Sequence, residues 1–152
     1  MAMTIQEISD RIEIDDLLTR YATALDAKDW DLFTACFTSD AYIDYTAAGG
    51  IKGALPEVRQ WLAEVMAAFP MTQHFVTNRA VDLDGDRATC RSCLFNPMGL
   101  PDGVSGLVVF FDGGHYRDRL VRTADGWRIA ERIEEPTFST RLHRVMLRPF
   151  EV

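Results

Sequence analysis

The N-terminal segment of the chain carries apolar residues at the spacing of an α-helix. Thr4 followed by Glu7 matches a capping box, in which each residue satisfies a free backbone N–H of the first turn. Charged residues fall between the apolar ones and are assigned to the opposite face: Glu7, Asp10, Arg11, Asp15 and Arg20. The pattern predicts one long helix with a core-facing stripe of Ile5, Ile8, Ile12, Leu17, Leu18, Tyr21, Ala22 and Leu25.

Asp26 continues this apolar stripe with a carboxylate. It lies one helical turn beyond Ala22 and two beyond Leu18, so it shares their face. A carboxylate on a core-facing stripe costs free energy unless another group pairs with it. Two interpretations are open: the side chain turns to solvent at the helix end, or it pairs with a group inside the core.

Two further helices and a strand follow. Asp29 can cap a helix with Trp30, Phe33 and Phe37 on one face, ending near residues 38–40. Residues 41–45 alternate as a strand, which places Ala41, Ile43 and Tyr45 on one side. The third predicted helix follows Pro56 and stops at Pro70, with apolar positions Val58, Trp61, Leu62, Val65, Met66 and Phe69.

After residue 70 the hydrophobic period changes from helical to two, which is typical of strands. The pattern predicts strands over 72–83, 87–95, 106–121 and 127–133, with a hairpin turn at 84–86 and a loop over 96–103. His74, Val76 and Asn78 share one face of the first strand. Gly113-Gly114 indicates a bulge, and Pro136 is expected to break the last strand.

This order of elements predicts an α+β fold as a single domain over residues 1–152. A strongly bent sheet wrapped around the long N-terminal helix leaves a cone with an open mouth, which suits a small-molecule pocket. With 47% hydrophobic residues the chain can bury a substantial core.

Charge and special motifs exclude several classes of function. A net charge of -7 argues against nucleic acid or an anionic membrane as partner. The sequence has no apolar run long enough to span a membrane and no signal-peptide pattern, so a cytoplasmic protein with reduced cysteines is expected. The three histidines lack metal-ligand spacing and no phosphate-binding glycine motif occurs, so we expect no metal and no nucleotide cofactor.

Several short motifs resemble one superfamily. Asp26-Ala27-Lys28-Asp29-Trp30-Asp31, Ile43-Asp44-Tyr45 and Thr72-Gln73-His74-Phe75 resemble scytalone dehydratase in order and spacing, and Asp26 with His74 resembles the catalytic pair of lindane dehydrochlorinase. The stretches 114–122 and 125–129 are similar to the SnoaL-like group. All belong to the NTF2-like superfamily, whose fold is a cone-shaped α+β barrel.

The resemblance implies a catalytic dyad of Asp26 and His74, with Tyr45 as the phenol that binds a substrate carbonyl oxygen. Two positions depart from scytalone dehydratase. The second active-site His of that enzyme has no counterpart at residues 95–97, and Leu25 stands where it has a pocket Tyr.

The chemistry of these side chains agrees with that assignment. Imidazole is suited to abstract a proton near neutral pH, and an adjacent carboxylate fixes its tautomer. Candidate substrate-binding residues are Tyr21, Asp118 and Trp30. A Tyr on an apolar helix face is more often a core residue, and Asp118 could equally pair with Arg128 or Arg132 across strands.

Two functions of different classes follow. The first is a cofactor-independent lyase or isomerase that removes a proton from a small hydrophobic cyclic substrate. The second is a non-catalytic assembly subunit, similar to the small subunit of ring-hydroxylating dioxygenases. The consecutive apolar residues 107–111 place some side chains on the outer face of the sheet, so we expect a homo-oligomer, trimer ahead of dimer, with residues 141–148 near the interface.

Overall fold

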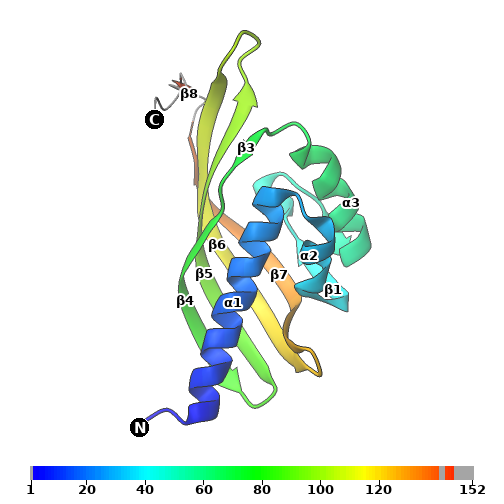
Figure 1. Ribbon diagram of the computed structural model, residues 1–152, viewed down its shortest axis with the longest axis vertical. Helices are drawn as coiled ribbons and strands as arrows, with labels where there is room; N and C mark the ends of the chain where they lie inside the picture. The colour runs from blue at the N-terminus through cyan, green and yellow to red at the C-terminus, as the bar shows by residue number, and fades with distance from the viewer. Residues whose placement is uncertain (1, 141–142, 146–152) are drawn as a thin grey trace, which may run out of the picture.

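A long helix crosses the concave face of a curled sheet in the computed structural model, which describes residues 2–140 and 143–145 (Figure 1). This helix, α1 (Ile5–Ala27), begins with the predicted capping box of Thr4 and Glu7. It ends at Lys28, whose left-handed backbone closes the last turn. None of the described helices is long and apolar enough to cross a membrane.

The buried face of α1 differs from the predicted stripe in its first half. Ile5, Ile8 and Ile12 are exposed, whereas Asp10, assigned to the polar face, is buried. Asp10 accepts hydrogen bonds from Trp127 Nε1 at 3.2 Å and from Arg122 at 2.6 Å. The core-facing stripe is therefore rotated from the predicted one, and runs through Asp10, Ile14, Leu17, Leu18, Tyr21, Ala24 and Leu25.

The second helix is shorter than predicted. α2 (Trp30–Ala35) is capped by Asp29, and Phe37 already belongs to strand β1 (Phe37–Asp44). The helix stops because the carbonyl of Cys36 accepts the Ile129 N–H at 2.9 Å, which starts the parallel pairing of β1 with β7 (Gly126–Ser139). Ala41 and Ile43 are buried on the predicted inward face, with Tyr45 buried just beyond the strand end.

Short elements then lead to the third helix. The 3-10 helix η1 (Thr46–Ala48) and strand β2 (Lys52–Ala54), which pairs antiparallel with β1, precede α3 (Leu55–Met66). α3 ends before Pro70 rather than at it. In Figure 1, α2 and α3 cover one end of the sheet beside the C-terminal end of α1.

The sheet is mixed and follows the order β2-β1-β7-β6-β5-β3. Its long members are β5 (Arg87–Pro101), β6 (Leu107–Thr123) and β7, and all neighbours are antiparallel except β1 with β7. β3 (Met71–Thr72) and β4 (Phe75–Asp84) both pair with β5, and the backbone of β8 (His143–Val145) pairs with β6. The α+β fold with a bent sheet around the N-terminal helix is confirmed.

Two predicted interruptions are absent from the strands. β5 continues through most of the predicted loop at 96–103 and ends at Pro101, paired with β6 from Arg87 onward. The two strands form a long hairpin that projects beyond the helices in Figure 1. β7 continues past Pro136 because that residue lies opposite Gly114. There the predicted bulge shifts the register, and a side chain on Gly114 would meet the Glu135 carbonyl oxygen at 2.5 Å.

The outer face of the sheet carries a row of aromatic rings. Phe95 packs against Phe75 with ring centroids 6.0 Å apart and stacks on Phe111 at 5.8 Å. Phe75 and Phe95 are exposed, as expected for a surface that another chain covers. The homo-oligomer stays a prediction, and most of the 141–148 segment assigned to its interface lies outside the described residues.

Candidate active site

A cavity of about 320 Å³ opens between the concave face of the sheet and helices α1 and α3. Three of the predicted residues line it, namely Tyr21, Tyr45 and His74. Most of the remaining wall is apolar and comes from α3 and from the inward faces of β5 and β6.

Asp26 lies at the C-terminal end of α1, where the helix dipole disfavours negative charge. Three donors offset this cost. The carboxylate accepts from the His74 backbone N–H at 2.9 Å, from His74 Nδ1 at 2.6 Å and from the Thr72 hydroxyl at 3.1 Å. Burial alone would raise the pKa of Asp26, but the hydrogen bonds from His74 outweigh burial and hold the pKa below its ordinary value.

The same contacts explain why the predicted strand over 72–83 is divided in two. Between β3 and β4, Gln73 donates its N–H to the Pro97 carbonyl at 3.0 Å, whereas His74 turns its N–H to Asp26. Further along β4, Asn78 adopts a positive φ of 49° at a register shift and is exposed, so it does not share the inward face of Val76. The break fixes both the backbone and the ring of His74 on Asp26.

The contacts of the His74 ring determine its tautomer. An ionised carboxylate can only accept, so Nδ1 carries the proton that bonds Asp26, and Nε2 presents its lone pair. Asn96 Nδ2 donates to this Nε2 at 3.1 Å, and Asn96 Oδ1 is buried without a partner among the described residues. Asp26 and Asn96 thus hold the two ring nitrogens of His74, which lies in the cavity wall.

Three phenols converge on another part of the wall. The Tyr21 and Tyr45 hydroxyls are 2.7 Å apart, and the Tyr21 hydroxyl lies 3.5 Å from that of Tyr116. Burial raises the pKa of all three, so each keeps its proton near neutral pH. The two internal bonds use two of the three hydroxyl protons, which leaves one donor for a ligand oxygen.

Two of the phenol rings pack against a buried ion pair, Asp118–Arg132. Arg132 stacks on the rings of Tyr21 and Tyr116 at 3.9 and 4.1 Å and binds Asp118 through two hydrogen bonds of 2.7 Å. Both charged side chains are inaccessible to solvent, so Asp118 takes the predicted cross-strand pairing and does not line the cavity. Trp30 does not line the cavity either, because it packs edge-on against Phe33.

Sequence analysis missed four polar residues of the wall, namely Asn96, Asp112, Tyr116 and Glu134. Asn96 stands in the 95–97 segment, where only the lack of a second His was noted. Glu134 has the strand phase of Arg132 on β7, and this alternation is the signal that could have revealed it. Burial raises the pKa of Glu134 to about 7, although the Arg132 charge opposes this.

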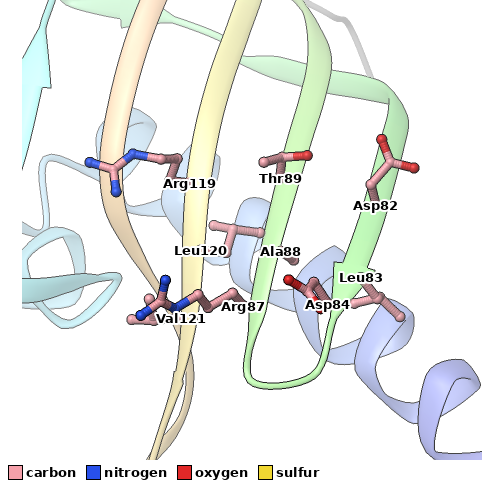
Figure 2. Close-up of a pocket in the computed structure, with 9 residues that line it drawn as sticks. All are labelled: Asp82, Leu83, Asp84, Arg87, Ala88, Thr89, Arg119, Leu120 and Val121. Atoms are coloured by element: carbon pink, nitrogen blue, oxygen red, sulfur yellow. The ribbon is translucent and has the colours of Figure 1, made fainter.

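A second hollow, of about 470 Å³, lies on the other side of the sheet from α1 (Figure 2). Exposed charged side chains dominate its rim, including Asp82, Arg87 and Arg119. Arg119 is already paired with Glu131 at 2.9 Å. Water screens solvated charges of this kind, so the inner cavity is the stronger candidate for chemistry. No three metal-binding side chains group together within the described part of the chain.

Comparison with known proteins places the chain in a family. Residues 6–133 match the SnoaL-like domain. An uncharacterised protein of Mycobacterium tuberculosis is 45% identical over 136 residues, which cover 90% of this chain and 91% of that protein. A structure of a Kribbella flavida protein is 30% identical, covers 88% of this chain and 95% of its own, and superposes with a TM-score of 0.81.

Several structures share the fold at lower sequence identity. A hexachlorocyclohexane dehydrochlorinase is 18% identical, with 96% of this chain and 97% of that chain covered and a TM-score of 0.81. Further similar structures include a scytalone dehydratase-like protein of Novosphingobium aromaticivorans and a dehydratase-like protein of the NTF2-like family from Streptomyces avermitilis. The chain is a member of the SnoaL-like family and shares the NTF2-like fold.

Proposed function

We propose that this protein is a cofactor-independent lyase, in which the Asp26–His74 dyad removes a proton from carbon next to a carbonyl group. The observation that carries the proposal is the 2.6 Å contact of His74 Nδ1 with Asp26, which leaves Nε2 unprotonated in the cavity wall. The fold shared with a dehydrochlorinase supports an elimination.

The dyad lowers the barrier to proton transfer in two ways. Nε2 accepts the substrate proton, and the ionised Asp26 stabilises the imidazolium that forms. General-base catalysis of this kind contributes a factor of about 10²–10⁴. The Asn96 amide gives way as the substrate approaches Nε2, since that lone pair accepts one hydrogen bond at a time.

The phenol cluster stabilises the other end of the reacting system. As the α-proton leaves, negative charge develops on the carbonyl oxygen, and a hydroxyl of Tyr45 or Tyr116 donates to it. Arg132 adds positive charge beneath the rings, which favours an oxyanion. The oxyanion site thus combines the predicted Tyr45 with Tyr21 and Tyr116.

The cavity volume supports a small cyclic substrate. About 320 Å³ is at the low end of the range of small-molecule sites, roughly 300–1,000 Å³. The apolar wall from α3 suits a hydrophobic ring. An accessible cavity at His74 also favours catalysis over the assembly-subunit alternative, in which the cavity would be vestigial.

Ligand screening followed by mutation tests the proposal. Cyclic ketones and phenols are screened by thermal shift, and the hits are assayed for loss of an α-proton by exchange in deuterated water. His74→Ala should lower the exchange rate by about 10²–10⁴-fold. His115→Ala is the matched control, because His115 does not line the cavity. Unchanged exchange in His74→Ala would refute the mechanism.

A further inference from the structure

Glu134 is a half-buried carboxyl in the wall of the same cavity. It lies on β7 opposite Tyr116, and its charge contributes to the raised pKa of Tyr45 and Tyr116, although burial is the larger cause. Among the residues that the structure describes, no hydrogen bond or ion pair involves its side chain. In contrast, the fully buried carboxylate of Asp118 is paired with Arg132.

The surroundings keep a proton on Glu134. The nearest cation, Arg132, is two residues away along the strand and gives two of its N–H groups to Asp118. Asp112 lines the cavity on the neighbouring strand and adds negative charge nearby. Removing the carboxyl from water without a counter-ion favours its neutral form. Glu134 is therefore an acid with a transferable proton at neutral pH.

The sheet places this acid across the cavity from the base. His74 follows β3, and the strand order from β7 through β6 and β5 to β3 puts three inter-strand spacings between the two residues. Both side chains line a cavity of only about 320 Å³, so one small substrate can contact both. Acid and base at opposite sides of one small cavity form a complementary pair.

We propose that Glu134 is a further catalytic residue, the general acid that protonates the leaving group, and that the substrate is a cyclic β-hydroxy carbonyl compound. This inference rests on the proposed elimination. His74 Nε2 takes the α-proton, and the C–H electron pair becomes the new C=C bond. The C–O bond breaks with its electrons on oxygen, and Glu134 gives its proton so that water departs.

The choice of leaving group follows from what the acid is needed for. Hydroxide is a poor leaving group and needs the proton, whereas chloride departs as an anion without one. After release of water, the imidazolium loses its proton and the Glu134 carboxylate regains one from solvent, so the cycle has no net proton change. A buried acid opposite the base would have no role in eliminating chloride.

The test compares two compounds that give the same product. 3-Hydroxycyclohexanone and 3-chlorocyclohexanone both yield cyclohex-2-enone, which is followed by ultraviolet absorption with the uncatalysed rate subtracted. Glu134→Gln should lower kcat on the hydroxy compound by about 10²–10⁴-fold and leave the chloro compound nearly unchanged. Glu135→Gln is the matched control. That residue is adjacent on β7 but is paired with Arg117 at 3.2 Å on the outer face, and its variant should alter neither rate.

Each other outcome has a distinct meaning. Equal loss on both compounds, or no loss on either, overturns the acid assignment. If His74→Ala retains full turnover of both compounds while Glu134→Gln still discriminates between them, the proposed dyad fails and the acid survives. Carboxyl ¹³C NMR of the substrate-free protein, assigned with Glu134→Gln, should show a protonated Glu134 at pH 6. A carboxyl that is fully ionised at pH 5.5 overturns the proposal whatever the turnover.

Discussion

Two carboxylate pairs that lie near the cavity, Asp118–Arg132 and Asp26–His74, are similar in construction and differ in solvent access. Each joins an acidic residue to a nitrogen base on another element, at 2.7 Å and 2.6 Å. The Asp118 and Arg132 side chains are 0% exposed. In the other pair the His74 side chain is 6% exposed and that of Asp26 is 27% exposed.

This difference separates a structural pair from the pair that we propose to be reactive. Arg132 keeps its proton at any accessible pH, and its solvent-free contact with Asp118 supports the phenol rings above it. His74 can gain and lose a proton, and its second nitrogen faces the cavity wall. A carboxylate beside a base indicates chemistry only where that base can exchange protons with a ligand.

The largest expected effect breaks the reactive pair. Asp26→Asn should lower turnover by about 10²–10⁴-fold, because an amide no longer holds the Nδ1–H tautomer of His74. The free energy of unfolding should fall by only about 1–2 kcal/mol, since Asp26 is part-exposed. Steady-state kinetics and urea denaturation of the same preparation measure both. Activity within twofold of wild type would show that the pair is structural.

The structural pair should show the opposite profile. Asp118→Ala should lower the free energy of unfolding by about 3–5 kcal/mol, because it leaves the Arg132 guanidinium buried without a counter-ion. Urea denaturation measures the loss.

The double variant Asp118→Leu with Arg132→Met sharpens this test, because it removes both charges and should recover most of the stability. In contrast, a double variant that removes both Asp26 and His74 should be no more active than Asp26→Asn alone. A double variant as unstable as Asp118→Ala would contradict the explanation.

The smallest expected effect concerns the carboxyl that has no partner. The pKa of Glu134 in the folded protein is about 7, against an ordinary value of 4.5. Between these values the folded state binds more protons than the unfolded state, so stability falls as pH rises from about 4.5 to 7. Glu134→Gln removes this slope and should stabilise the protein above pH 7 by up to about 3 kcal/mol.

Urea denaturation at several pH values measures this slope. Below pH 4.5 the variant and the wild type should have nearly equal stability, because Glu134 is then protonated in both the folded and the unfolded state. An unchanged slope in Glu134→Gln would show that another group titrates in this window.

Local features of the sequence determined most of the helices and strands. They also indicated one part of the candidate site, the Asp26–His74 pair. The capping box of Thr4, the alternation that buries Ala41 and Ile43, and the glycine bulge at 113–114 were predicted and are present. Each depends on residues only a few positions apart. The motifs around Asp26 and His74 indicated the dyad through resemblance.

Only the tertiary structure decided which polar groups meet. Asp10 was assigned to solvent and binds Arg122 and Trp127, more than a hundred positions away. Asn96 was placed in a loop and contacts His74, and Glu134 attracted no notice although it lines the cavity. Hydrophobic periodicity gives the face of a residue within its own element. The partner of a charged group depends on strand register and on the angle at which the helix crosses the sheet, and long-range packing sets both.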